Sequence, residues 1–239
     1  MSEKNLILAV DVGTTETKAV LVSPDGYIDS RQSSCCLCYP DKSCVEQSPE
    51  EISDAIYQSS RAVLAAHPDL IARLAGLVFT SQMQNTVPVD RGGKPLMNML
   101  SWMDERAACF TQEDMFRGWV KIEGYPVSKL LKFMRITGGM PGKTGKDTVC
   151  KLAWMKKNKP DLYASVHKFL DAKDYAVFLA TGNYVTSHDM ANVTWLMDAR
   201  DKDLGKWAWS EEIHRMYGLD SRKMPELRAS TAMAGSVTA

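Results

Sequence analysis

The chain of 239 residues is long enough to bury a large core, as one large domain or as two small ones. Its 29 lysine and arginine residues equal its 29 aspartate and glutamate residues, so no global basic field would attract a nucleic acid. No apolar stretch is long enough to span a membrane. Residues 1–5 lead straight into a run of strand length, so we expect no signal peptide.

The first predicted elements are two apolar runs that flank a polar turn, Asn5–Val10 and Thr17–Val22. Asp11 follows the first strand, where its carboxylate can hold a hydrated Mg²⁺. Gly13 lets a phosphate approach the backbone, and the amides and hydroxyls of Thr14 and Thr15 can donate to it. Lys18 adds a positive charge. A phosphate site and an ordinary hairpin, with Asp and Gly chosen for turn geometry, fit this motif equally well.

A tight turn over 23–26 leads into a third predicted strand, Tyr27–Cys38. We expect the strand over 17–22 to run antiparallel to the one over 6–10, which gives a mixed sheet. One face of that sheet is predicted to carry the first long helix, over 48–66.

That helix has clear start and stop signals in the sequence. Ser48 is the predicted N-cap, and Glu51 would complete a capping box. His67 and Pro68 would end the helix. Its predicted apolar face consists of Ile52, Ile56, Ser59 and Val63.

Four of the six cysteines fall within ten residues: Cys35, Cys36, Cys38 and Cys44. They lack the paired spacing of zinc knuckles, and no histidine lies nearby, so cysteine acting as a small hydrophobe is favoured over a metal site. The six cysteines suggest a reducing compartment in which the thiols stay free, and we expect a cytoplasmic protein. The four histidines are scattered and form no zinc-hydrolase motif.

Beyond a buried strand over 75–79 and a short one over 86–89, the chain becomes more helical and basic. Helices are predicted over Asp104–Met115, Val127–Arg135, Thr148–Asn158, Asp161–Val166, Asp174–Ala180 and Glu211–Tyr217, with Gly182 and Gly218 as C′ residues. The lysines over 121–159 are interpreted as a solvated helical face. Residues 138–144 look like a P-loop but have Thr137 where glycine is required, and they are interpreted as a connecting loop.

Several segments, in the same order, resemble the FGGY carbohydrate kinases, the family that includes xylulokinase and glycerol kinase. They are residues 6–22, 45–51, 79–84, 100–106, 148–158, 174–182 and 189–196. The segment over 148–158 nearly reproduces the family signature, and the match departs from the pattern at its first position, Lys146. Within it we expect Trp154 in the core and Lys151 near the rim of the cleft.

The resemblance extends from about Leu6 to the last residue, and it implies an α/β fold. The fold would be an actin-like ATPase (ribonuclease H-like) domain, a mixed sheet with flanking helices. ATP and Mg²⁺ are the implied cofactors, with Asp11 on the metal and the phosphates held by Gly13, Thr14, Thr15 and Lys18. The implied partner is a small sugar or polyol, and a homodimer of the full-length enzyme stays open.

The resemblance also implies which residues contact the sugar. Gln82, Met83 and Gln84 follow a strand end, Trp102 offers a flat apolar surface and Asp104 a hydrogen-bond acceptor. Xylulokinase-like members have histidine at the position of Gln84, and glycerol kinases have Arg-Glu at the pair, so the substrate stays open. Alternatively, Trp102 is a core residue and Asp104 a helix N-cap.

The family's catalytic aspartate lies in a Gly-Gly-Asp-type motif after the segment that matches 224–237. The resemblance therefore places this general base beyond Ala239, and no catalytic residue is expected within the chain. We expect residues 1–239 to be the N-terminal domain of a carbohydrate kinase, inactive alone and without the C-terminal domain. The alternative is a non-catalytic sugar-binding or regulatory module derived from the same fold.

Overall fold

The computed structural model describes residues 4–238. Residues 1–3 and Ala239 lie outside that range. The expectation that no signal peptide is present rests partly on residues 1–3 and therefore also falls outside the described residues. The described residues divide into two compact units, the first formed by residues 4–38 and 47–82 and the second by residues 39–46 and 83–238.

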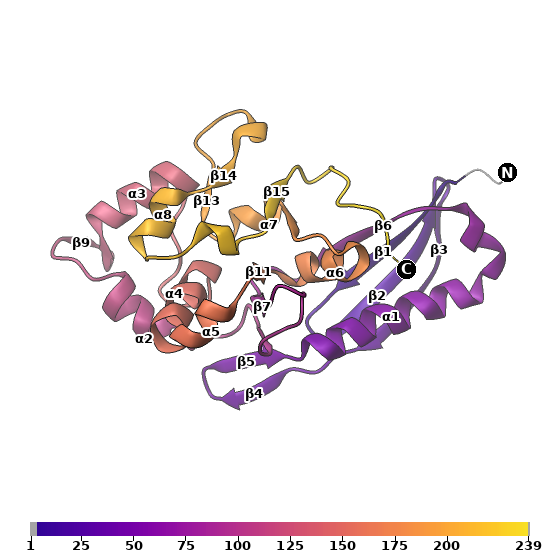
Figure 1. Cartoon of the computed structure of the whole chain (residues 1–239), viewed down its shortest axis with the longest axis horizontal. Helices are drawn as coiled ribbons and strands as arrows, with labels where there is room; N and C mark the ends of the chain where they lie inside the picture. Colours follow the sequence, from indigo (N-terminus) through magenta and orange to yellow (C-terminus); the bar gives the residue numbers. More distant parts are fainter. Residues whose placement is uncertain (1–3, 239) are drawn as a thin grey trace. The chain divides into compact units, whose positions relative to one another are not determined.

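The first unit is built on a four-stranded sheet in the order β3-β2-β1-β6 (Figure 1). Strand β2 is antiparallel to β1 and to β3, and β6 is parallel to β1, so the predicted mixed sheet is confirmed. The bounds of these strands are Leu6–Val12 for β1, Glu16–Ser23 for β2, Gly26–Ser34 for β3 and Leu74–Ser81 for β6.

The predicted third strand, Tyr27–Cys38, is too long, because β3 ends at Ser34. Its partner β2 begins at Glu16, so the backbone beyond Cys35 has no further strand residue of β2 to pair with. The N–H of Cys36 donates instead to the Glu51 carboxylate, at 3.2 Å.

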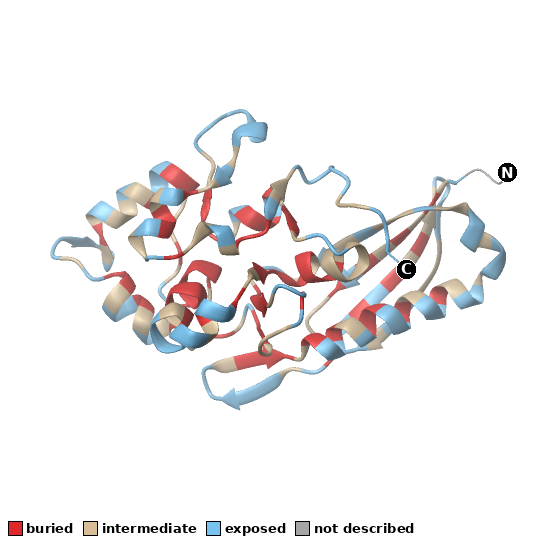
Figure 2. Cartoon of the chain, in the orientation of Figure 1, coloured by how far each residue is buried: buried red, intermediate tan, exposed pale blue. Residues whose placement is uncertain are grey.

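Helix α1, Pro49–Ala66, packs against β2 and β3. Its predicted apolar face is buried while the opposite side is exposed (Figure 2), and it ends before His67, as predicted. Ser48 is confirmed as the N-cap, since its hydroxyl accepts from the Glu51 N–H at 3.2 Å. The reciprocal half of the predicted capping box is not formed, because the Glu51 carboxylate binds the Cys36 N–H. A short 3₁₀ turn, Pro68–Arg73, leads to β6.

We expect Ser48→Ala to lower the free energy of unfolding by about 1 kcal/mol, because one N–H of the first helical turn loses its acceptor. Urea unfolding followed by circular dichroism measures the change. Ser60→Ala, on the same helix but away from its end, is the matched control and should change stability by less than about 0.5 kcal/mol. Equal effects of the two substitutions would contradict a capping role.

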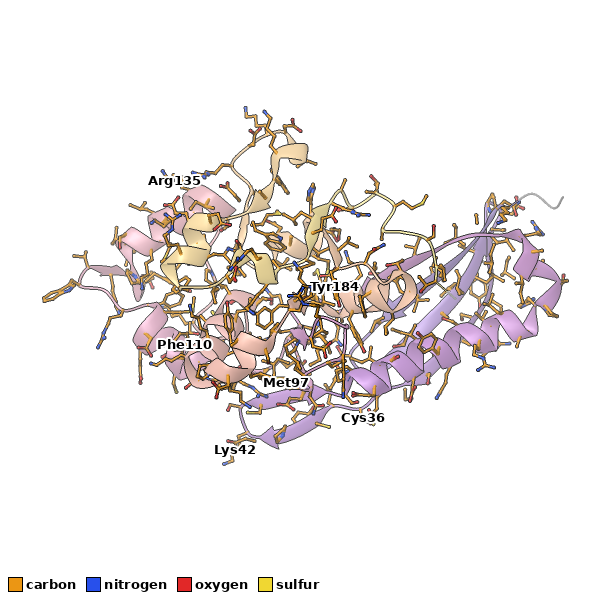
Figure 3. The ribbon with its side chains drawn as sticks, in the orientation of Figure 1. Cys36, Lys42, Met97, Phe110, Arg135 and Tyr184 are labelled. Atoms are coloured by element: carbon orange, nitrogen blue, oxygen red, sulfur yellow. The ribbon has the colours of Figure 1, made fainter. Side chains whose placement is uncertain are left out.

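In the second unit, short strands pair locally. Strands β4 and β5 form a hairpin, with Lys42 at its outward tip (Figure 3), and β5 pairs with β8. The other pairs are β7 with β11, β9 with β10, β12 with β15, and β13 with β14. The bounds are Cys38–Asp41 (β4), Cys44–Gln47 (β5), Val87–Val89 (β7), Met99–Leu100 (β8), Lys121–Ile122 (β9), Tyr125–Pro126 (β10), Lys168–Leu170 (β11), Val185–Ser187 (β12), Met197–Asp198 (β13), Ala208–Trp209 (β14) and Glu226–Arg228 (β15).

The helices of the second unit surround a buried core that includes Phe133, Ile136, Val149, Leu152, Met155, Leu196 and Ile213. Their bounds are Ala108–Phe110 (α2), Val127–Thr137 (α3), Thr148–Asn158 (α4), Pro160–Ser165 (α5), Ala172–Thr181 (α6), His188–Asn192 (α7) and Glu211–Met216 (α8), with a π-helical turn at Thr111–Met115 and 3₁₀ turns at Leu204–Lys206 and Ser221–Lys223.

The predicted helix over 148–158 is confirmed residue for residue. The predicted helix over 104–115 is wrong in its first part, since residues 101–107 form turns. The Asp104 carboxylate there accepts from the N–H of Val45 on β5, which holds this segment out of a helix. Gly182 and Gly218 adopt left-handed φ angles of 71° and 62° after their helices, as predicted for C′ residues.

Residues 138–144 form a loop between α3 and α4, so the prediction of a connecting loop is confirmed. Lys132 and Arg135 on α3 pair with Glu212 of α8 at 3.0 and 3.2 Å, and Arg135 points outward (Figure 3). Over residues 4–238, no helix is long and apolar enough to cross a membrane.

Candidate functional site

The polar turn of the first unit presents two opposite charges side by side. Asp11 on β1 and Lys18 on β2 are register partners, and both are exposed. They alternate along the strands with buried residues such as Val10 and Val12, so they lie on the face of the sheet opposite to those side chains. Within residues 4–238, no side chain donates a hydrogen bond to the Asp11 carboxylate. A single exposed carboxylate suits Mg²⁺, which keeps several waters and takes its other ligands from phosphates.

Neutral amides hold the backbone of this turn. The Gln82 amide nitrogen donates to the carbonyl of Gly13 at 3.3 Å and to Oε1 of Gln47 at 2.6 Å. The Thr14 hydroxyl donates to Oε1 of Gln82 at 3.1 Å, and the Gln47 amide donates to the Thr14 carbonyl at 2.9 Å. The Gln82 amide, which was expected to contact the sugar, thus binds the polar turn around Gly13 instead.

Gly13 is required by close packing within the turn. Its N–H donates to the carbonyl of Glu16 at 3.0 Å, and a Cβ at this position would lie 2.7 Å from that carbonyl oxygen. Thr15, beside it, is exposed to solvent. The contribution of Gln47 was missed, because a buried glutamine next to a helix start carries no distinctive sequence signal.

In the second unit, two loops carry the remaining amino acids that were predicted to contact the sugar. Met83 and Gln84 lie in the first loop, and Trp102 and Asp104 lie in the second. The side chains of Met83 and Trp102 are 49% and 40% exposed, so both offer apolar surface to a ligand. Asn85 connects the loops, since its Oδ1 accepts from the Trp102 N–H at 3.1 Å. These four predicted residues are therefore gathered on two adjoining loops.

Asp171 in turn holds Asn85. Its two carboxylate oxygens accept from the Asn85 backbone N–H and side-chain amide, both at 3.1 Å. Burial raises the pKa of Asp171 to about 6, against the lowering effect of these hydrogen bonds. Asn85 and Asp171 were both missed by the sequence analysis, since neither type marks a site by itself.

Asp104 is fully buried, and its carboxylate is occupied within the protein. It accepts from the Val45 N–H at 2.7 Å and from the Arg106 guanidinium at 2.8–3.0 Å. Arg106 also donates to Glu46 at 2.6 Å. In this structure Asp104 anchors the second loop to the β4–β5 hairpin.

Lys151 was predicted to lie near the rim of the cleft, and this prediction is wrong, because the residue is fully buried. Its Nζ donates to the carbonyls of Gln84 at 2.8 Å and Ser101 at 2.7 Å, so it ties the two loops together from inside. Burial lowers the pKa of Lys151 to about 8, and the nearby carboxylates, Asp104 foremost, partly oppose this shift. Trp154, predicted in the core, is only partly buried, with the Arg106 guanidinium 5.6 Å from its ring centre.

The clustered cysteines differ in exposure. Cys35 is buried, whereas Cys36 and Cys38 are exposed and Cys44 is intermediate. Only Cys35 therefore packs as the small hydrophobe that we predicted. Within the part of the chain that the structure describes, no group of three or more His, Cys, Asp or Glu residues is placed to hold a metal.

The sequence matches the family described as FGGY family of carbohydrate kinases, N-terminal domain, over residues 6–239. It is 27% identical to a gluconokinase of Bacillus subtilis (strain 168) over 236 residues, which cover 94% of this chain and 40% of the relative. It is 29% identical to a xylulose kinase of Lactococcus lactis over 234 residues, which cover 98% of this chain and 43% of that relative.

The fold is similar to the crystal structure of a xyloylose kinase from Brucella ovis, with a TM-score of 0.82 and 25% identity. The match covers 98% of this chain and 44% of that one. The predicted α/β fold of the actin-like ATPase class is thereby confirmed. The chain spans less than half the length of the relatives it matches.

Proposed function

The chain belongs to the FGGY family of carbohydrate kinases, and on that premise we propose that residues 1–239 are the N-terminal domain of an ATP-dependent carbohydrate kinase. The first unit binds phosphate groups of ATP together with Mg²⁺. The second unit binds a sugar or polyol. The preorganised polar turn around Gly13 is the observation that carries this proposal.

The phosphate assignment rests on the geometry of the first unit. Gly13 keeps the turn open to close approach, and the exposed Thr15 supplies a further hydroxyl donor. Lys18 provides the positive charge opposite Asp11. Asp11 would hold Mg²⁺ through its exposed carboxylate, and the bound metal would supply positive charge to neutralise the phosphates.

The sugar assignment rests on the two loops of the second unit. Trp102 and Met83 present apolar surface to the C–H face of a polyol, and Gln84 offers hydrogen bonding to its hydroxyls. Asp104 and Lys151 are buried and stabilise the two loops through hydrogen bonds. Gln82 serves the phosphate turn, through the contacts of its amide.

In the proposed reaction, a sugar hydroxyl oxygen forms a bond to the γ-phosphorus of ATP. The bond from that phosphorus to the β,γ-bridging oxygen breaks, ADP leaves, and the hydroxyl proton passes to a general base. We assign that base to no residue of this chain. The contribution of residues 1–239 is to bind and orient.

We expect the 239-residue chain to bind one of glycerol, D-xylulose and D-gluconate weakly, and to release no ADP in response. Isothermal titration calorimetry measures binding, and a coupled assay measures ADP. Trp102→Ala should weaken binding about tenfold, because the sugar loses its flat apolar contact. Asp11→Asn, in the phosphate turn of the other unit, should leave that affinity within about twofold.

Robust polyol-dependent ADP release from this chain alone would contradict the assignment of the base outside it. Equal loss of polyol affinity in Trp102→Ala and Asp11→Asn would show that Asp11 supports the fold rather than the metal. Failure of all three compounds to bind would contradict the sugar-binding role.

A further inference from the structure

The side chain of Gln84 is held in one orientation by contacts with the start of α4. Its amide nitrogen donates to Oδ1 of Asp147 at 3.1 Å and to the carbonyl of Val193 at 3.3 Å. Its own backbone carbonyl accepts from Lys151 at 2.8 Å. Gln84 is therefore fixed both through its backbone and through its side chain.

The two partners of the amide determine which of its ends faces them. A carboxylate and a backbone carbonyl can only accept hydrogen bonds, so the group that meets both must be the NH₂ end. Both N–H bonds of Gln84 are then used inside the protein. Its Oε1 is the free end, and no side chain within residues 4–238 donates to it.

The side chain of Asp147 binds neighbouring loops and does not cap its own helix. It occupies the N-cap position of α4, yet its side chain accepts no N–H from the first turn of the helix. Its Oδ1 accepts from Gln84 and from Nε1 of Trp195, the latter at 2.7 Å, and its Oδ2 accepts from the Gly142 N–H at 2.7 Å. The carboxylate is thus committed to loops outside its own helix.

The two residues that donate to Oδ1 of Asp147 both have a strained backbone. Gln84 and Trp195 have left-handed φ angles of 64° and 61°, which side-chain-bearing residues rarely adopt. Both donate to the same oxygen of Asp147. A Cβ on Gly139 would lie 2.4 Å from the Trp195 ring, so glycine is required beside it. Strained residues persist where the surrounding contacts hold them, and they cluster at functional sites.

We propose that Asp147 is a specificity-determining positioning residue, which orients the Gln84 amide so that it offers the substrate only an acceptor. This inference rests on the proposed function and deepens it. The substrate group that meets Gln84 is a hydroxyl, the donor that matches Oε1. A carbonyl, carboxylate or phosphate oxygen is rejected at this point, because two acceptors would face each other.

The orientation itself is tested in the unliganded 239-residue chain by NMR. The Gln84 NH₂ signals, assigned by their loss in Gln84→Met, should be protected from solvent exchange and show an NOE to the Trp195 indole N–H. Asp147→Asn should abolish the protection, because the new side chain can present its own NH₂ to Gln84. Asp161→Asn, at an exposed site on α5, is the matched control and should leave the signals unchanged. Unprotected Gln84 protons in the wild-type chain would overturn the proposal, whether or not Asp147→Asn folds.

The selection step is tested by calorimetry with glycerol, D-xylulose and D-gluconate. Asp147→Asn should weaken the best-bound compound about tenfold, but by less than about twofold in a Gln84→Met background. A purely structural role of Asp147 would give equal losses in both backgrounds, and that result would overturn the proposal. If the wild-type chain binds none of the three, the proposed function and the selection step both fail, whereas the NMR result still decides the orientation.

Discussion

Replacing Lys151 by Met is expected to lower the free energy of unfolding by about 3–5 kcal/mol. Methionine fills a similar volume, but it supplies no donor to the carbonyls of Gln84 and Ser101. The substitution also removes a cation that favours the charged form of the buried Asp171 carboxylate, and an uncompensated buried charge is costly. Urea unfolding at pH 7, followed by circular dichroism, measures the loss.

Lys157→Met, on the same helix, is the matched control. Lys157 is exposed and pairs with Asp114 at the surface, so its loss should cost less than about 1 kcal/mol. Weaker polyol binding is also expected in Lys151→Met, since the two loops lose their common support. A loss below about 1 kcal/mol in Lys151→Met would show that water or a shifted loop replaces the ammonium group without cost.

Asp174→Asn is expected to stabilise the chain at pH 8, by on the order of 3 kcal/mol, and to have little effect at pH 4. Burial, reinforced by the neighbouring Asp171 carboxylate, raises the pKa of Asp174 from 3.8 to about 7. The folded state therefore binds a proton that the unfolded state releases between these values. The stability that this proton contributes is complete below pH 3.8 and is lost as the pH rises through 7.

Asparagine keeps an acceptor for the Asp171 N–H, which the Asp174 carboxylate accepts at 3.3 Å in the capping box of α6, and it never charges. The measured quantity is the difference in unfolding free energy between variant and wild type at several pH values. It should grow from pH 4 to pH 8. Asp54→Asn, at an exposed position on α1, should give a difference that stays nearly constant. A variant that is less stable than wild type at pH 8 would mean that the Asp174 charge is needed in the fold.

The sheet and α1 were predictable because their signals are local. Alternating apolar residues mark the strands, and Ser48 and His67 mark the helix ends without help from distant parts of the chain. The predicted helix over 104–115 failed because a contact distant in sequence, between Asp104 and Val45, overrides the helical pattern. Helix propensity predicts local structure only weakly, and here the need of a buried carboxylate for a hydrogen-bond donor outweighs it.

For the site, residue types were predictable but their partners were not. The polar turn and the two loops could be located from strand ends and from the family resemblance. The position of Lys151 was wrong because lysine is rarely buried, and only the folded chain brings two free carbonyls to its ammonium group. Asp147 carried no distinctive signal in the sequence, and its contact with Gln84 spans 63 positions of the chain.

The uncharged amides that hold the polar turn around Gly13 bear on how ionic strength acts on this protein. Gln47, Gln82 and Thr14 carry no charge, so the hydrogen bonds between them do not depend on the ionisation of a side chain, and salt should screen them little. The groups that would meet a phosphate or its metal, Lys18 and Asp11, are exposed charges whose attraction is screened beyond about 8–10 Å at physiological ionic strength. Salt should therefore weaken the capture of an anion from solution while leaving intact the turn that receives it.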